Sequence, residues 1–212
     1  MSKIYSIKEI YLTIQGEGRQ AGRAAVFCRF TGCNLWTGLE KDRDSAICNF
    51  CDTDFRGMDG PNGGQYSAPD LAQAVANLWP NTRNGKPYVV CTGGEPLLQL
   101  DVSLVDAFHE RGFEVAIETN GTLAAPSNVD WICMSPKPTG QWQLRTGHEL
   151  KLVFPQEGMD PEQFQDFEFD HFLLQPMDGP HLEENTKKTI AYCMAHPQWM
   201  VSLQTHKYAG IP

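Results

Sequence analysis

Short apolar runs recur along the chain, and their length predicts β-strands rather than helices. Many contain β-branched and aromatic residues, which suit a pleated, half-buried surface. Most are bounded by glycine, proline or asparagine, which are typical of turns. The strands that this pattern predicts are Ile7–Ile14, Ala25–Phe30, Tyr88–Thr92, Glu114–Glu118, Trp131–Met134, Glu149–Phe154, His171–Leu174 and Met200–Gln204.

Three stretches between these runs have apolar residues at helical spacing, and they predict the helices Ala68–Trp79, Val102–Arg111 and Glu183–Ala195. Ser67 and Asp101 stand where an N-cap side chain accepts hydrogen bonds from free backbone N–H groups. Residues that end the helices follow each stretch: Pro80, Gly112 and Pro197. The apolar residues that set the spacing are Leu71, Val75, Leu78, Leu104, Val105, Phe108, Ile190 and Met194.

Strands that alternate with helices predict parallel β/α units. A complete eightfold barrel of such units usually needs about 250 residues, whereas this chain has 212. We therefore expect an α/β fold, an incomplete TIM-type barrel of mostly parallel strands with few helices. The active site of such a barrel lies at the C-terminal ends of its strands. Polar motifs stand at those ends: Thr92–Glu95, Glu118–Gly121, Ser135–Lys137 and Gln175–Asp178.

The composition favours one domain over residues 1–212, because 41% of the residues are hydrophobic and can fill a sizeable core. The Gly/Pro/Asn-rich segment Arg56–Gln65 predicts a surface loop that is too short to separate two domains. The net charge of -9 is spread without a basic stripe. Nucleic-acid binding needs basic patches, so we expect small-molecule partners and no nucleic acid.

We expect a cytoplasmic protein without a membrane segment. Lys3, Lys8 and Glu9 interrupt the start of the chain, which therefore lacks the pattern of a signal peptide. No apolar run approaches the roughly 20 residues of a membrane helix. The seven cysteines are an odd number, so a disulfide framework is disfavoured and a metal or catalytic role is favoured.

Three of the cysteines, Cys33, Cys48 and Cys51, are close in sequence, and the last two form a C-x2-C pair. Three thiolates are one fewer than a closed zinc or iron–sulfur site takes from protein. An iron–sulfur cube held by three thiolates leaves one iron open to a small molecule. A structural zinc site is the alternative, but no histidine precedes His109 as a fourth ligand. The remaining cysteines fit buried core positions: Cys28, Cys91, Cys133 and Cys193.

Together with Gly93–Pro96 after a strand, the three cysteines resemble the radical S-adenosylmethionine (SAM) superfamily. Most members have the spacing C-x3-C-x2-C, and this chain departs from it by inserting residues 34–47 into a loop that spans 33–51. A C-x14-C-x2-C spacing is found in some 7-carboxy-7-deazaguanine synthases, the radical SAM enzymes of the deazapurine pathway. Further segments are similar to that family along nearly the whole chain: Gln15–Gly18, Cys51–Thr53, Glu118–Gly121, Ser135–Lys137, Gln175–Asp178 and His206–Pro212.

This resemblance implies two cofactors, a 4Fe–4S cluster on the three cysteines and SAM on its open iron. Glycine lets main chain approach a ligand closely, so Gly94 is expected beside the SAM amino group. Phe50 resembles the aromatic residue near the adenine, and Glu118 is expected at the ribose. The whole set of residues implied for SAM is Phe50, Cys51, Asp52, Gly94, Glu118, Ser135, Pro136, Lys137, Gln175, Pro176, Met177 and Asp178.

The resemblance also implies a pterin substrate and a Mg²⁺ ion. Thr53 is the implied magnesium ligand, and the substrate carboxylate completes its oxygen shell. Glu17 suits the guanidine-like edge of a pterin, and Arg29 suits its carboxylate. The family uses its C-terminal residue at the substrate, which places Pro212 there. The whole set implied for the substrate is Ile14, Gln15, Gly16, Glu17, Arg29, Thr92, His206 and Pro212.

The implied reaction begins when a reduced cluster cleaves SAM to a 5′-deoxyadenosyl radical. The radical takes hydrogen from C6 of 6-carboxy-5,6,7,8-tetrahydropterin. The ring contracts with loss of ammonia to 7-carboxy-7-deazaguanine, in 7-deazapurine (queuosine) biosynthesis, and SAM is regenerated. The implied partners are a flavodoxin- or ferredoxin-like electron donor and a second copy in a homodimer.

Two other functions fit part of the pattern. An activating enzyme for a glycyl radical protein shares the cluster but not the substrate residues. A zinc module that only holds the loop 33–51 together performs no chemistry. Taken singly, several residues also fit ordinary roles: Glu95 as a helix cap, Thr53 as a turn residue, Glu118 as a solvated strand end and His206 as a surface histidine.

Overall fold

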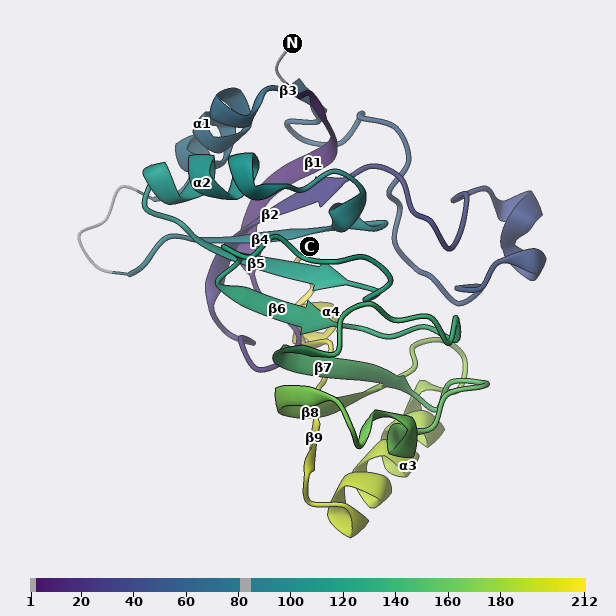
Figure 1. Ribbon diagram of the computed structural model, residues 1–212. Coiled ribbons are helices and arrows are strands. Elements are labelled where there is room, and N and C mark those ends of the chain that lie inside the picture. The colour runs from purple at the N-terminus through teal and green to yellow at the C-terminus, as the bar shows by residue number, and fades with distance from the viewer. Residues whose placement is uncertain (1–2, 81–84) are drawn as a thin grey trace.

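A computed structural model of the chain describes residues 3–80 and 85–212, and its strands form a single curved sheet (Figure 1). The strand order is β3-β1-β2-β4-β5-β6-β7-β8-β9. The strands are β1 Tyr5–Ile14, β2 Ala24–Phe30, β3 Gly64–Tyr66, β4 Tyr88–Gly93, β5 Glu114–Thr119, β6 Trp131–Met134, β7 Thr146–Phe154, β8 Glu168–Pro176 and β9 Trp199–Val201.

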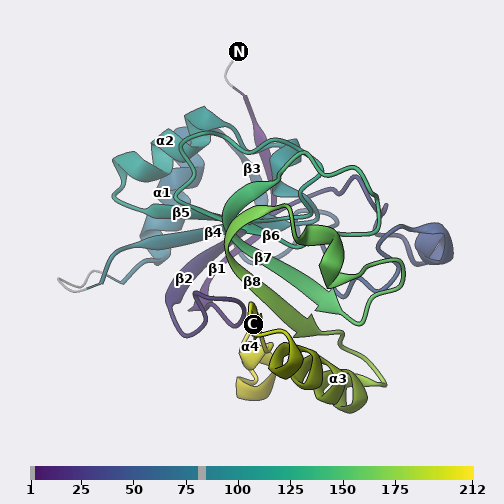
Figure 2. The same cartoon turned by 60° about the horizontal axis from the view of Figure 1, so that its bottom comes forward.

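Parallel pairing runs without interruption from β2 to β9, whereas β1 pairs antiparallel with both β2 and β3. The two outermost strands, β3 and β9, do not pair with each other, so the sheet stays open. Viewed from below, the sheet curls into part of a barrel (Figure 2). The predicted incomplete barrel is confirmed.

Helices are few, as expected: α1 Ala68–Leu78, α2 Val102–Glu110, α3 Leu182–Ala195 and α4 Thr205–Ala209. The hydroxyl of Ser67 accepts a hydrogen bond from the Asp70 N–H, and the Asp101 carboxylate accepts one from the Leu104 N–H, so both predicted N-caps are confirmed. The connections β5–β6 and β6–β7 contain no α-helix. The loops there, residues 120–130 and 135–145, leave the strand ends open to the site.

Side chains that alternate along the strands pack into two separate hydrophobic clusters. The side chains on the outer face pack under α1 and α2 in the main core, which includes Leu71, Val75 and Phe108. A small second cluster around Tyr88 and Val90 fills the inside of the barrel. The apolar filling is therefore confined to one end of the interior, and the other end is free for polar groups.

Four details differ from the sequence predictions. The predicted loop Arg56–Gln65 ends early, because Gly64–Tyr66 pairs with β1 as β3. The last strand is Trp199–Val201 rather than Met200–Gln204. Helix α4 occupies the C-terminal segment, where no helix was predicted. In α3 the residues that set the spacing face solvent, since Ile190 is 41% and Met194 is 75% exposed.

None of the helices formed by residues 3–80 and 85–212 has the length and apolar character needed to cross a membrane.

Candidate active site

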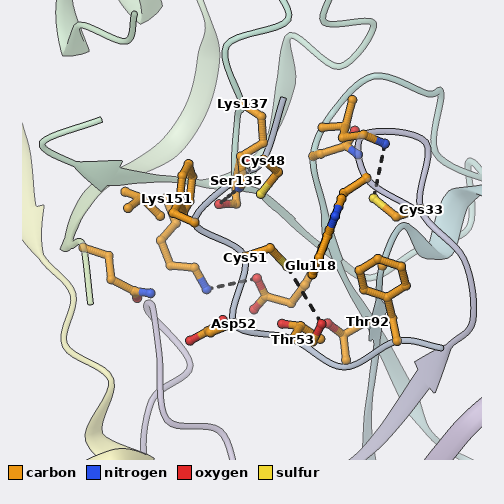
Figure 3. A pocket seen from close by; sticks show the side chains of 18 of the residues that line it. Cys33, Cys48, Cys51, Asp52, Thr53, Thr92, Glu118, Ser135, Lys137 and Lys151 are labelled. Atoms are coloured by element: carbon orange, nitrogen blue, oxygen red, sulfur yellow. Dashed lines mark hydrogen bonds and ion pairs between the residues drawn. The ribbon is translucent and has the colours of Figure 1, made fainter. Parts of the chain in front are cut away.

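The cysteine loop lies at the C-terminal ends of the parallel strands, where Cys33, Cys48 and Cys51 line one cavity (Figure 3). The Cys51 N–H donates to the Cys48 carbonyl at 3.3 Å and closes the turn between them. Part of the insertion, the short helix Glu40–Ser45, projects away from the sheet (Figure 1).

Arg43 in this insertion fixes the cysteine turn, a role that the sequence did not suggest. Its Nη1 donates to the carbonyls of Asn49 at 2.8 Å and Cys51 at 3.0 Å. The guanidinium lies over the ring of Trp36, 4.3 Å from its centroid. The added residues therefore hold the backbone of the C-x2-C pair from outside.

The three thiols differ in their readiness to ionise. A hydrogen bond from Cys48 lowers the pKa of Cys51 to about 6, and the same contact, with burial, raises the pKa of Cys48. Burial also raises the pKa of Cys33. Lys137 offers a positive charge that lowers the pKa of both Cys48 and Cys51. Cluster binding takes thiolates, so a nearby cation suits this loop.

The spacing of the cysteines argues against a single zinc ion. Zinc binds thiolates at about 2.3 Å, which brings its ligand atoms close together. Within the described residues, the only three-donor group with all ligand atoms within 4.8 Å of one another is Glu118, Cys133 and Glu149. Cys33, Cys48 and Cys51 do not form such a group, so at least one pair of these sulfurs is more than 4.8 Å apart, which suits a larger cluster.

The Gly-Gly-Glu-Pro run brings backbone, not a carboxylate, to the cavity. A Cβ on Gly93 would meet the Phe30 carbonyl at 2.2 Å, and one on Gly94 would meet the Gly32 carbonyl at 2.2 Å. Glu95 is fully buried and accepts from the Leu97 N–H, so it is the helix cap considered above.

Glu95 also ties this strand end to the next one. It accepts from the Thr119 hydroxyl and from the Asn120 N–H, both at 2.8 Å. The motifs after β4 and β5 are thereby held as one unit.

The first cavity, of about 210 Å³, brings together nearly all residues predicted for SAM. Pro136 is the exception, because it is buried behind the cavity wall. It nevertheless sets the positions of its neighbours, since the Lys137 ammonium donates to the Ser135 hydroxyl at 2.8 Å. The predicted residues that line this cavity are Cys33, Cys48, Phe50, Cys51, Asp52, Thr53, Gly94, Glu118, Ser135, Lys137, Gln175, Pro176, Met177 and Asp178.

A second cavity, of about 400 Å³, adjoins the first. All eight residues predicted for the substrate line it: Ile14, Gln15, Gly16, Glu17, Arg29, Thr92, His206 and Pro212. The two cavities share the wall residues Glu17, Asp52, Thr53, Thr92, Glu118 and Gln204. A molecule in one cavity therefore lies next to a molecule in the other.

Arg29 does not stand alone in the second cavity. Its Nε donates to Glu9 at 2.8 Å and its Nη2 donates to the Tyr11 hydroxyl at 3.0 Å. Tyr11 stacks on Phe27, with the ring centroids 5.7 Å apart. Sequence analysis missed Glu9 and Tyr11, because the register of β1 shifts between Ile7 and Glu9 and breaks the period-2 pattern there.

The C-terminal segment forms a further wall. Thr205 donates from its N–H to the Gly16 carbonyl at 2.9 Å, and the Thr13 hydroxyl donates to the Pro212 main-chain oxygen at 2.8 Å. The Lys207 ammonium bridges Asp52 at 2.7 Å and Asp178 at 2.5 Å. Sequence analysis assigned no role to this lysine, which ties α4 to the cysteine loop and to the loop after β8.

One lysine, Lys151, lines the first cavity (Figure 3) and pairs with two carboxylates that line both cavities. Its ammonium lies 2.7 Å from Glu17 Oε2 and 3.0 Å from Glu118 Oε2. Burial alone raises the pKa of Glu17, but Lys151, together with Gln204 and His206, outweighs burial and holds that pKa at about 2. Glu118 is 19% exposed and ion-paired, so it is not the solvated strand end that its position also allowed.

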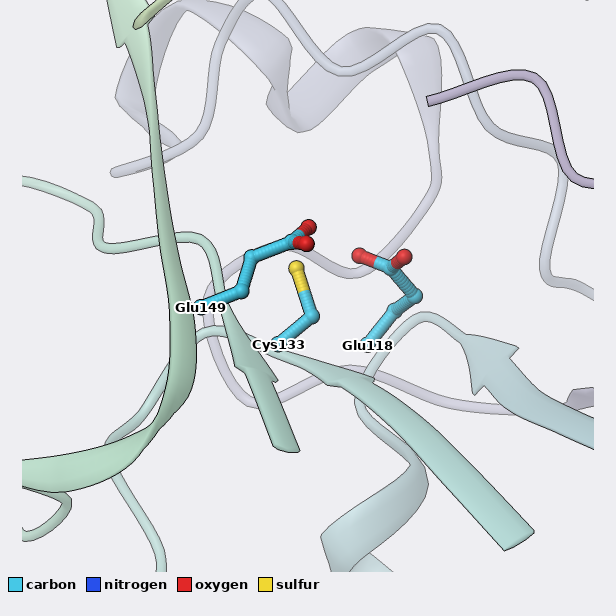
Figure 4. A group of neighbouring side chains, drawn as sticks. All are labelled: Glu118, Cys133 and Glu149. Carbon is cyan, nitrogen blue, oxygen red and sulfur yellow. The ribbon is translucent and has the colours of Figure 1, made fainter. Parts of the chain in front are cut away.

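Glu118, Cys133 and Glu149 converge inside the barrel (Figure 4). Cys133 was predicted to be a core thiol; it is buried, but its neighbours are carboxylates. The Glu149 carboxylate accepts from the Arg19 N–H at 2.7 Å, and Lys151 already supplies a cation to Glu118. This group is therefore part of the ion network around Lys151 and not a separate metal centre.

Comparison with known proteins agrees with this geometry. The family model of the Radical SAM superfamily matches residues 45–136. The fold and the cysteine-lined cavity thus define a radical SAM enzyme. A 7-carboxy-7-deazaguanine synthase of Caulobacter vibrioides is 59% identical, covering 98% of this chain and 99% of its own length. Its counterpart in Bradyrhizobium diazoefficiens is 60% identical with the same coverage. The chain therefore belongs to the family of 7-carboxy-7-deazaguanine synthases.

A solved structure of QueE from Escherichia coli has the same fold, with a TM-score of 0.69 and 25% identity. The match covers 96% of this chain and 95% of that one. Membership of the radical SAM superfamily implies a 4Fe–4S cluster and SAM as cofactors. Three cysteines in one cavity wall, with the backbone of Gly93 and Gly94 exposed beside them, fit that pair of groups.

Proposed function

We propose that the protein converts 6-carboxy-5,6,7,8-tetrahydropterin into 7-carboxy-7-deazaguanine and ammonia. When bound, the cluster and SAM supply a 5′-deoxyadenosyl radical, and these cofactors carry the difficult chemistry. The observation that carries the proposal is the shared wall of the two cavities. A radical must act on its substrate at short range, and adjoining cavities allow it.

In the first cavity, the role of the chain is to bind and orient the cluster and SAM. Cys33, Cys48 and Cys51 would hold the cluster, and the backbone at Gly93 and Gly94 would admit the SAM amino group. The remaining contacts to SAM would come from Phe50 and Asp52 in the cysteine loop and from the motifs at the ends of β6 and β8, with Glu118 at the ribose. Helix α4, tied to those loops through Lys207, restricts the access of water.

On the substrate side, Glu17 faces the guanidine-like edge of the pterin, because its low pKa keeps it an anionic acceptor. Arg29 binds the substrate carboxylate, held in place by Glu9 and Tyr11. Thr53 lies on the wall between the cavities and provides one oxygen ligand to Mg²⁺, which otherwise keeps waters and substrate oxygens.

The wider setting is also part of the proposal. One domain spans residues 1–212, with the loop 33–51 and its insertion 34–47 as the cluster-binding segment. An external flavodoxin- or ferredoxin-like donor supplies electrons in the cytoplasm, where a reducing environment preserves the cluster. The protein forms a homodimer and needs neither nucleic acid nor membrane.

Anaerobic turnover tests the reaction. Reconstituted, reduced protein is given SAM, Mg²⁺ and 6-carboxytetrahydropterin, and the products are identified by mass spectrometry. We expect 7-carboxy-7-deazaguanine, with little net consumption of SAM. Formation of 5′-deoxyadenosine without this product would retain the radical chemistry and refute the substrate. Metal analysis separates both outcomes from the zinc module. An iron–sulfur protein is brown and contains iron and sulfide, whereas the zinc module is colourless and contains zinc.

A further inference from the structure

We propose that Lys151 is a positioning residue of the active site, one that holds Glu118 for SAM and Glu17 for the pterin with a single ammonium group. This inference rests on the proposed function, because it uses the ligand assigned to each carboxylate. It concerns a residue on β7 that no motif in the sequence singled out.

The burial of Lys151 is the first argument. Its side chain is only 3% exposed, and a buried ammonium is costly unless charged partners compensate it. Two of its three donors are used, one by Glu17 and one by Glu118. The geometry of both carboxylates therefore depends on one atom, Nζ.

Charge is the second argument. The groups that face Lys151 come from every element around it: Glu17 from the β1–β2 loop, Glu118 from β5, Cys133 from β6 and Glu149 from its own strand. Lys151 thus pairs with two carboxylates, and a third, Glu149, lies close to Glu118, with His206 from α4 acting on Glu17. An ion pair that only stabilises the fold has one cation for each anion. The group around Lys151 instead has more carboxylates than ammonium groups at the cavity wall.

Position is the third argument. Lys151 lines the first cavity, and both of its partners line both cavities. Gln15 also donates to Glu118 at 3.2 Å, and Gln204 donates to Glu17 at 2.8 Å. Each carboxylate is thus held by an amide from the substrate side and by the shared lysine. Removal of the ammonium leaves the carboxylates free to repel each other and to turn away.

Binding measurements on Lys151→Ala test this role without turnover. Dissociation constants for SAM and for 6-carboxytetrahydropterin are measured separately, under anaerobic conditions, on cluster-loaded protein. We expect both affinities to fall by about tenfold or more, since a buried charge loses its partner. Iron and sulfide content is expected to stay at the wild-type level.

Chemical rescue separates charge from packing. Propylammonium has the atoms that alanine lacks at position 151, and propanol has nearly the same shape without the charge. Recovery of both affinities with propylammonium but not with propanol supports the positioning role. Equal recovery with both compounds, or wild-type affinities in Lys151→Ala, overturns it.

Two controls keep the result decisive. Lys151→Met fills the volume without the charge and replaces the alanine variant if that one does not fold; wild-type affinities in it also overturn the role. Arg23→Ala removes a different ion pair of the sheet, the one with Glu114, and is expected to leave both affinities unchanged. Failure of the wild type to convert the pterin contradicts the proposed function only, because the loss and rescue of SAM binding are measured without pterin.

Discussion

Strand β5 carries a glutamate near each of its ends, and the barrel uses the two carboxylates in opposite ways. At the closed end, Arg23 meets Glu114 through two parallel hydrogen bonds of 2.8 and 3.0 Å. The guanidinium lies over the Tyr88 ring, 3.7 Å from its centroid, and Lys86 adds a second cation. At the open end, Glu118 shares Lys151 with Glu17, close to Glu149.

The difference between the two ends lies in charge balance. The closed end has two cations for one carboxylate, arranged in a bidentate geometry that needs no further partner. The open end has more carboxylates than cations and faces two cavities. We infer that the first arrangement stabilises the barrel, while the second is kept for ligands at some cost in stability.

The largest expected effect is at the open end, in the cysteine loop. Cys48→Ala removes one of the three ligands, so we expect complete loss of the cluster and of turnover, with the fold retained. Iron and sulfide analysis and circular dichroism check this. Cys193→Ala is the matched control, because Cys193 is half-buried on α3 and away from the cavity. A cluster that survives in Cys48→Ala contradicts the assignment of the loop.

At the closed end the expected effect is on stability instead. Arg23→Ala leaves Glu114 without its bidentate partner, and we expect a loss of about 1–3 kcal/mol in the free energy of unfolding. Denaturant unfolding measures the loss. Turnover per folded molecule is expected to stay within about twofold of the wild type, because ordinary mutations away from a site act through stability. A large loss of turnover at full stability would erase the contrast between the two ends.

The pH dependence of stability tests the role of Glu114 at the closed end. Arg23 holds the pKa of Glu114 at about 2, below the ordinary 4.5. A carboxylate with a lowered pKa takes up protons more readily in the unfolded chain, so its stabilising effect is present above about pH 4.5 and lost as the pH falls towards 2. Glu114→Gln is expected to be less stable at neutral pH and to lose less stability on acidification. If the free energy of unfolding depends on pH in the same way in the wild type and the variant, this prediction is wrong.

The smallest expected effect concerns magnesium at the cavity wall. Thr53→Ala removes one oxygen donor, and we expect the Mg²⁺ concentration for half-maximal turnover to rise by about tenfold while the cluster stays intact, since water can replace a single ligand. Thr53→Ser keeps the hydroxyl and serves as the control. An unchanged magnesium response in the alanine variant removes Thr53 from the ligand set.

The sequence was sufficient for the architecture, and it named residues that the structure brings together around two cavities. The apolar runs located most strands, and the spacing of the three cysteines indicated the loop that we propose to hold the cluster. Motifs at strand ends were brought together because parallel strands end at one edge. Helix α4 was missed because Thr205–Ala209 is short and depends on contacts with Gly16, the cysteine loop and the loop after β8.

The residues that support the site were the hardest to predict. Lys151 stands in an apolar run and looked like one polar residue of a strand, because only the curling of the sheet brings it to Glu17 and Glu118. Arg43 reads as a surface charge in an insertion, and its contact with the cysteine turn depends on how that insertion folds. Such contacts join distant segments, so local sequence patterns do not reveal them.

The central claim is that the open end of the barrel holds SAM and the pterin side by side. Turnover of 6-carboxytetrahydropterin with deuterium at C6 tests it most directly, with the recovered SAM analysed by mass spectrometry. Because hydrogen must pass between neighbouring ligands, we predict that deuterium appears in SAM when 7-carboxy-7-deazaguanine forms. Product formation with no deuterium in SAM or in 5′-deoxyadenosine would contradict the claim.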